Sequence, residues 1–269
     1  MKTFTSQIES HTQIRHSFCS RMLMLMTTTF ALVFVTIGLP QAASAATPIT
    51  CGGPPITESG EYFLKEDCPV DNFKNAIDIQ ASKVQLNMRG HTISGAIKTP
   101  SDCEVPPPPG RDVGIGISVG GSDVEIRNGA VIHLNIGIQF KEGHDNHAHN
   151  LTVTGNCLGI QVFNSDNNQI NGNNVSGNFT NGLELNHANN NAVISNVVNN
   201  NGVKCCGASG IRLDTSSGNL IESNKIFANL TTGLRLAHSN NNFILDNKVN
   251  GMLSTKMWTS RGGSESTAM

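Results

Sequence analysis

The chain has 269 residues and a formal net charge of −2, with 14% of its residues charged and 5% aromatic. The near-neutral charge and the absence of a basic run argue against nucleic-acid binding. No segment after residue 45 is apolar enough to span a membrane.

The first 45 residues are predicted to be a signal peptide. Three basic residues precede an apolar run from Met22 to Leu39, and Ala43-Ser44-Ala45 supplies the small-residue pattern that signal peptidase recognises. An uncleaved membrane anchor is the alternative, because the run is almost long enough to span a bilayer. Three threonines interrupt the run and favour cleavage after Ala45. We therefore expect an exported protein, periplasmic or extracellular, with no membrane attachment after cleavage.

Residues 46–75 are expected to form an N-terminal cap region. Six cysteines follow the cleavage site, and an even number in an oxidising compartment favours disulfides. Cys51 and Cys68 close a short loop and are the expected pair. No spacing of the zinc-site type occurs, so a structural role for the cysteines is favoured. The partners of four cysteines stay open: Cys103, Cys157, Cys205 and Cys206.

Residues 76–253 contain an internal repeat. A block of Gly, apolar, polar and apolar residues recurs at spacings of 21, 22, 23, 28 and 23 residues. An earlier copy begins at Ala76, before an insertion that contains the run from Pro106 to Pro109. In the later repeats two asparagines stand five residues apart, and an apolar residue follows the second one. The six blocks begin at Gly116, Gly137, Gly159, Gly182, Gly210 and Gly233.

This repeat predicts stacked coils of short strands. A short strand with one apolar face cannot bury that face alone, whereas stacked coils align equivalent apolar residues into a continuous core. Stacking also places equivalent asparagines one strand spacing apart, where their amides can bond to one another. Residues 151–250 contain 25 Asn. A disordered Asn-rich tract is disfavoured because the apolar residues keep register with the asparagines. A leucine-rich solenoid is disfavoured because the sequence lacks its Leu consensus.

The Gly-Ile-x-Ile strand, the Asn-Asn-x-Ile-x-x-Asn-x-Val block and the opening Cys51-Gly52 resemble the right-handed β-helix repeat proteins of the pectin-lyase-like superfamily. The nearest subgroup is the NosD-type periplasmic repeat, and the resemblance covers roughly residues 50–250. It implies an all-β fold, a right-handed parallel β-helix of about seven coils with an Asn-rich turn ladder. It does not fix an activity, because function resides in sites added to a fold.

The residue between the two apolar positions of each strand is expected to face outward and to form a column along the solenoid. Such a column suits an extended acidic polysaccharide, with arginines pairing with uronate carboxylates and His or Asp exchanging protons. The alternative is a solvated surface with a weak cross-strand ion pair. The last three coils make the column charged and supply the predicted substrate-binding residues: Glu184, His187, Arg212, Asp214, Arg235 and His238.

Enzymatic activity is left open by the sequence. If the protein is an enzyme, a polysaccharide lyase or epimerase is favoured over a hydrolase. Glycoside hydrolysis usually needs two carboxyl groups across one bond, and of the late acidic residues only Glu184 and Asp214 share a strand column. A non-catalytic structural or adhesive surface solenoid is the further alternative.

Three histidines within six residues, His144, His147 and His149, form the predicted metal site, expected in a loop between two strands. Imidazole suits borderline metals such as copper. The NosD-type family is described as copper-binding, so the resemblance favours copper; calcium is the other candidate cation. Ordinary polar loop histidines are the alternative interpretation.

The repeat ends after Val249, and residues 254–269 form a polar tail with no evident cap. An uncapped solenoid end exposes apolar edge. Three explanations stay open: the tail folds over the end, a partner covers it, or the chain is a truncated member of its family.

Overall fold

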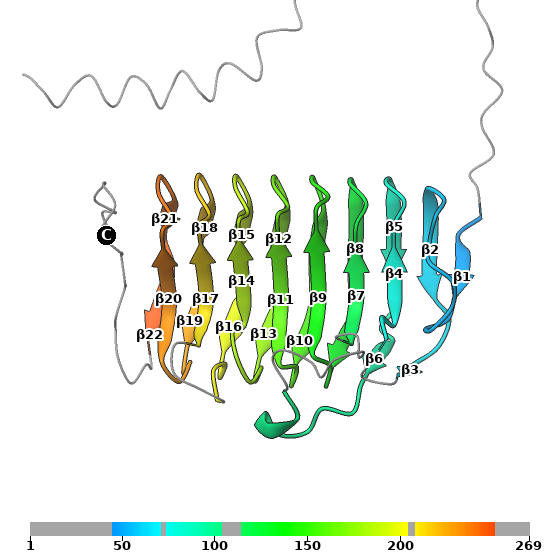
Figure 1. Cartoon of the computed structure of the whole chain (residues 1–269), viewed down its shortest axis with the longest axis horizontal. Coiled ribbons are helices and arrows are strands. Elements are labelled where there is room, and N and C mark those ends of the chain that lie inside the picture. Colours follow the sequence, from blue (N-terminus) through cyan, green and yellow to red (C-terminus); the bar gives the residue numbers. More distant parts are fainter. Residues whose placement is uncertain (1–44, 71–73, 104–113, 204–207, 251–269) are drawn as a thin grey trace, which may run out of the picture. The chain divides into compact units, whose positions relative to one another are not determined.

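The computed structural model describes residues 45–70, 74–103, 114–203 and 208–250 (Figure 1). These residues belong to one compact unit. Within them, no helix has both the length and the hydrophobicity needed to cross a membrane. The predicted signal peptide up to Ser44, the proline run, Cys205 and Cys206, and the polar tail lie outside the described residues.

One of the two sheets carries the predicted Gly-apolar-polar-apolar blocks. It has seven strands, which lie in chain order from one coil to the next, and all of its pairs are parallel. One strand per coil gives the seven coils that the repeat predicted. The strands are β4 (Ile77–Ile79), β7 (Ile115–Val119), β9 (Ile136–Lys141), β11 (Leu158–Phe163), β14 (Leu183–Asn186), β17 (Ser209–Asp214) and β20 (Thr232–Ala237).

The second sheet has fifteen strands and is also parallel throughout. Its two strand rows continue the same coils, and a 3-10 turn, η1 (Pro100–Asp102), lies in the described part of the insertion after β6. Together the sheets form the predicted right-handed parallel β-helix. The strands are β1 (Thr47–Ile49), β2 (Gly60–Leu64), β3 (Cys68–Pro69), β5 (Val84–Asn87), β6 (Thr92–Ser94), β8 (Val124–Ile132), β10 (His147–Thr154), β12 (Gln169–Asn171), β13 (Asn174–Ser176), β15 (Ala192–Ile194), β16 (Val197–Asn199), β18 (Leu220–Glu222), β19 (Lys225–Phe227), β21 (Phe243–Leu245) and β22 (Lys248–Asn250).

The N-terminal segment continues the sheet. Strand β1 pairs in parallel with β2, and β2 pairs with β5. Cys51 and Cys68 form a disulfide with their Cα atoms 5.7 Å apart, which confirms the predicted pair. The bridge ties the chain after β1 to the start of β3.

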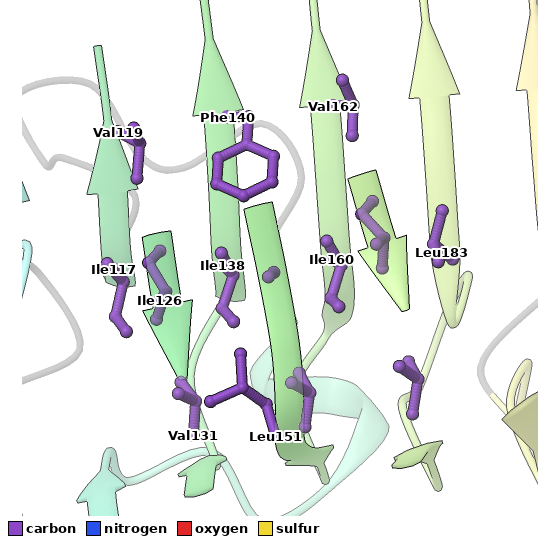
Figure 2. Close-up of a cluster of buried hydrophobic side chains, with 14 of the residues drawn as sticks. Ile117, Val119, Ile126, Val131, Ile138, Phe140, Leu151, Ile160, Val162 and Leu183 are labelled. Carbon is purple, nitrogen blue, oxygen red and sulfur yellow. The ribbon is translucent and has the colours of Figure 1, made fainter. Parts of the chain in front are cut away.

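The core consists of apolar columns (Figure 2). Successive residues of a column pair in register from coil to coil, and their side chains have no exposed surface. Fully burying an aliphatic side chain of this size stabilises a fold by about 1.5–3 kcal/mol. Repetition of the same contact, rather than a closed globular core, therefore holds the coils together. One column contains Ile117, Ile138, Ile160, Leu183 and Ile211.

Three buried asparagine ladders run along the solenoid. In each, the side-chain oxygen of one Asn accepts the backbone N–H and in most cases the amide of the equivalent Asn one coil earlier. The first two ladders follow the sequence register described above. The third was not anticipated from the sequence. Its members are Asn156, Asn178, Asn201 and Asn229.

The third ladder packs against the glycines that open four of the blocks, Gly137, Gly159, Gly182 and Gly210. A Cβ atom on Gly182 would lie 2.6 Å from the amide nitrogen of Asn201 and 2.8 Å from the carbonyl oxygen of Gly210. Gly210 meets Asn229 in the same way, at 2.6 Å. Only glycine permits this approach, because real Cβ atoms do not come so close to other heavy atoms.

The insertion after β6 is anchored to a later coil by a second disulfide. Cys103 and Cys157 are bonded with their Cα atoms 5.5 Å apart, and they pack with Ile97 and Phe179 in a small cluster outside the main core. The sequence left this pairing open.

The last described coil has an apolar surface. The side chains of Phe243, Leu245 and Val249 on β21 and β22 are exposed. The three explanations for this end, a tail that folds over it, a partner that covers it or a truncated chain, stay predictions.

Candidate functional site

Strands β8 and β10 bring two histidines and a carboxylate together on the outer face of the fifteen-stranded sheet. Glu125 lies opposite His147, and Arg127 lies opposite His149. Ala148, between the two histidines, is fully buried, so strand alternation directs both imidazoles outward. Their rings stack with centroids 4.4 Å apart.

Neighbouring side chains hold the three groups in place. Nε2 of His149 lies 2.8 Å from Oε1 of Glu125, and the guanidinium of Arg127 donates to Oε2 of the same carboxylate. Nε2 of His147 contacts the side-chain oxygen of Asn171, one coil further on. Burial acts to raise the pKa of Glu125, but the hydrogen bonds from His149 and Arg127, together with the Arg127 charge, outweigh it and lower the pKa. The carboxylate is therefore ionised at neutral pH.

The donor atoms of Glu125, His147 and His149 could hold a single metal ion. One ligand atom from each residue lies within 4.8 Å of the others. Ligands about 2.0 Å from one ion are at most about 4 Å apart, so small side-chain rotations close the set. Two imidazoles and one carboxylate also leave positions for water or another ligand. Beside them lies an open hollow lined in part by Lys83, Gln85, Asp123 and Asp145.

His144, the third predicted ligand, does not lie with the other two. Its Nδ1 is 2.8 Å from the carboxylate of the adjacent Asp145, and 60% of its side chain is exposed. It precedes the strand and forms an isolated β-bridge with Asp166, whereas His147 and His149 belong to β10, so the predicted loop location is wrong for these two. Within the described residues, the group that could hold a metal contains Glu125 in place of His144.

The predicted outward column lies on the seven-stranded sheet. Its residues pair in unbroken register from coil to coil, and side-chain contacts join its members from Gln139 to Arg212. The amide of Gln139 donates to Gln161 at 2.6 Å, and Gln161 donates to Glu184 at 3.4 Å. The members of the column are Asp78, Ser118, Gln139, Gln161, Glu184, Arg212 and Arg235.

Arg212 is the centre of the charged part of this column. Its Nη2 donates to Asp214 at 2.6 Å, and its Nε lies 3.7 Å from Glu184. Burial raises the pKa of Glu184, opposed by the Arg212 charge. Burial also acts to raise the pKa of Asp214, but the hydrogen bond and charge of Arg212 outweigh it and lower the pKa. The two carboxyl groups on either side of one guanidinium are thus shifted in opposite directions.

The remaining predicted residues of the column are only partly brought together. Nδ1 of His238 lies 3.7 Å from Asp214, and Arg235 is the register partner of Arg212. His187 is exposed and contacts Asn186 instead, with Nδ1 2.6 Å from the amide oxygen. This cluster and the metal-ligand group belong to different sheets, so they face different sides of the solenoid.

A sequence model of the family described as periplasmic copper-binding protein (NosD) matches residues 73–265, which include both candidate sites. The chain belongs to the NosD family. Glu125, His147 and His149 lie inside the matched region, and their side chains are of the kinds that bind metal ions. The family is described as copper-binding. No curated protein matches the chain.

Solved structures similar to this NosD-family chain include two tailspikes and a lyase. The Dettilon tailspike protein is 15% identical, covers 74% of this chain and 46% of its own, and has a TM-score of 0.51. Tailspike protein 2 of an Escherichia coli O157:H7 bacteriophage is 11% identical, covers 72% and 33%, and scores 0.48. The alginate lyase of Paenibacillus sp. is 11% identical, covers 74% and 91%, and scores 0.44. This chain thus spans about half of the Dettilon tailspike and about a third of tailspike protein 2. The likeness shows the fold alone.

Glu125 is the member of this group that sequence reasoning missed. It stands 22 residues before His147, which is one coil of this NosD-family repeat, and the same offset separates Arg127 from His149. The coil length therefore contained the signal. Counting histidines along one segment could not reveal it, because the third donor comes from the neighbouring coil.

Proposed function

We propose that this protein is an exported copper-binding β-helix in which Glu125, His147 and His149 hold the ion. The convergence of their three donor atoms on one outward face carries the proposal. Membership of a family described as periplasmic copper-binding supports the choice of metal. The two disulfides support an oxidising compartment, and the periplasm is the location we infer.

The donor set favours copper over calcium. Calcium takes six to eight oxygen ligands, whereas two of the three donors here are imidazole nitrogens, which suit copper and its neighbours in the first transition row. Arg127 holds one oxygen of Glu125 and leaves the other directed at His149, and Asn171 fixes the ring of His147. Such outer contacts orient metal ligands and raise their affinity.

Purified protein is expected to bind one copper ion per chain, measured by isothermal titration and by metal analysis after dialysis. Replacing both histidines, His147→Ala with His149→Ala, is expected to weaken binding by at least about 100-fold, since even outer contacts of a metal site contribute 10–100-fold. Glu125→Gln, which keeps the size of the side chain and removes its charge, is expected to weaken it in the same direction.

The matched control is His144→Ala. His144 lies three residues before His147 but outside the ligand group, so its loss is expected to leave copper affinity unchanged. If His144→Ala weakens binding as much as Glu125→Gln does, the ligands are the three histidines of one segment and our assignment is wrong. If the unmodified protein binds no copper, the proposed function is wrong.

We infer a second candidate function, the binding of an acidic polysaccharide along the seven-stranded sheet. The observation that favours it is the unbroken outward column, in which glutamine amides lead to the register pair Arg212 and Arg235. Amides suit sugar hydroxyls, and guanidinium groups suit uronate carboxylates. A lyase or epimerase activity would need the same arginines beside a proton-accepting group, and Asp214 and His238 are the nearby candidates.

Arg235→Gln tests this second function without removing the partner of Glu184. Binding to alginate or polygalacturonate, measured on a glycan array and by titration, is expected to weaken roughly tenfold, as expected for loss of one charge-assisted contact. The matched control is Lys225→Gln, on the other sheet in β19. Equal weakening by both variants would indicate general charge attraction, and absence of binding to any acidic polymer would exclude the function.

A further inference from the structure

The metal-ligand group contains nitrogen and oxygen donors only. Two imidazoles and a carboxylate come from β10 and β8, and the next side chains around them are the amide of Asn171 and the guanidinium of Arg127. Nitrogen and oxygen donors in a tetragonal arrangement are typical of Cu(II), whereas Cu(I) is selected by thiolate and thioether sulfur. The carboxylate charge also favours the divalent over the monovalent ion.

Sulfur donors are sequestered elsewhere in the described part of the chain. The four cysteines described there form the two disulfides, and a disulfide offers no thiolate. Met88, the methionine in the described ranges, is fully buried in the core. Among the residues that the structure describes, neither kind of sulfur can join Glu125, His147 and His149 around an ion.

The open side of the group is polar. The adjacent hollow is lined by side chains that include Lys83, Gln85, Asp123 and Asp145, with no sulfur and no aromatic ring apart from His147. Water or a small anionic ligand can therefore complete the coordination of a cupric ion from this side, which a low-coordinate cuprous ion does not require.

We propose that this site is selective for Cu(II) and releases the metal when it is reduced by one electron. The inference rests on the proposed function, because it assigns the oxidation state that the same three residues hold. The electron comes from an external small-molecule reductant of the ascorbate class, which is oxidised as Cu(II) becomes Cu(I). Apart from the metal-ligand bonds, no bond of the protein is formed or broken.

The test uses the full chain loaded with one equivalent of Cu(II). Electron paramagnetic resonance is expected to show a tetragonal cupric signal with hyperfine coupling from two nitrogens. Competition titrations, with a Cu(II) chelator in air and with a Cu(I) chelator under anaerobic ascorbate, are expected to give a Cu(II) affinity at least about 100-fold above that for Cu(I). Addition of ascorbate is expected to transfer the copper to the Cu(I) chelator.

Glu125→Met provides a matched variant that exchanges the hard donor for a soft one of similar length. It is expected to lower Cu(II) affinity, raise Cu(I) affinity and retain the metal after ascorbate. If the unmodified protein holds Cu(I) as tightly as Cu(II), the inference is overturned while the proposed copper binding stands. If it binds copper in neither oxidation state, both are overturned.

Discussion

Asn196→Ala is expected to lower the free energy of unfolding by about 3–5 kcal/mol, because one side chain satisfies four buried polar groups. Its oxygen accepts the backbone N–H and the amide of Asn173, at 2.9 and 3.1 Å. Its own amide donates to the carbonyl of Ile170 at 2.9 Å and to Asn224 at 3.0 Å. Alanine removes all four bonds at a position with no solvent exposure, so water cannot replace them.

The matched control is Asn174→Ala in the preceding coil. Asn174 follows a ladder asparagine directly in the chain, but its side chain is exposed on β13, and its loss is expected to change the free energy of unfolding by less than about 0.5 kcal/mol. Urea unfolding followed by circular dichroism provides the measurement. Solenoids need not unfold as one unit, so a second probe must give the same transition before free energies are compared. Equal effects of the two substitutions would show that the ladder does not stabilise the coils.

The sequence repeats a third asparagine position in addition to the two from which the ladders were predicted. Asn168, Asn173 and Asn178 are spaced by five residues, and the next coil repeats the spacing at Asn191, Asn196 and Asn201. Each of these two coils thus has three corners at which the chain turns, and each corner carries one buried Asn. The third position was not predicted because the sequence register was defined only by pairs of asparagines that an apolar residue follows. The fold was predictable because stacking requires the same residue at the same place in every coil.

The candidate sites were predictable only in part, for a physical reason. Alternation along one strand correctly predicts that His147 and His149 share a face, since the side-chain period of a strand is two. It says nothing about the neighbouring coil, from which Glu125 comes. Contacts between the ends of side chains, such as the hydrogen bond between His144 and Asp145, depend on side-chain torsion angles, which the sequence period does not determine.

In the charged column, too, the sequence predicted the register of the residues but not their ion pairs. The register Glu184, Arg212 and Arg235 follows from the repeat, and the structure has it. The ion pairs are different, because Arg212 bonds most closely to Asp214 two residues along its own strand rather than to Glu184 across the coils. Burial raises the pKa of Glu184 against the opposing Arg212 charge, whereas for Asp214 the hydrogen bond and charge of Arg212 outweigh burial and lower the pKa.

Removing the second disulfide, by Cys103→Ser with Cys157→Ser, is expected to lower the free energy of unfolding by about 4 kcal/mol. The bond joins residues 54 positions apart, and the entropy of closing a loop of this length in the unfolded chain gives that magnitude. Both cysteines are buried against Ile97, so exposure of the insertion adds to the loss. Thermal and urea unfolding of the double variant, beside the oxidised parent, measures it.

The first disulfide provides an internal comparison. Cys51 and Cys68 are 17 positions apart, for which the same relation gives about 3 kcal/mol, so Cys51→Ser with Cys68→Ser is expected to cost about 1 kcal/mol less than the other pair. If loss of the first disulfide lowers the free energy of unfolding more than loss of the second, loop entropy is not the dominant cause. Local packing at the N-terminal coil would then explain the effect. Copper affinity is expected to survive both changes, because Glu125, His147 and His149 are fixed by the strand ladder between β8 and β10 rather than by either bond.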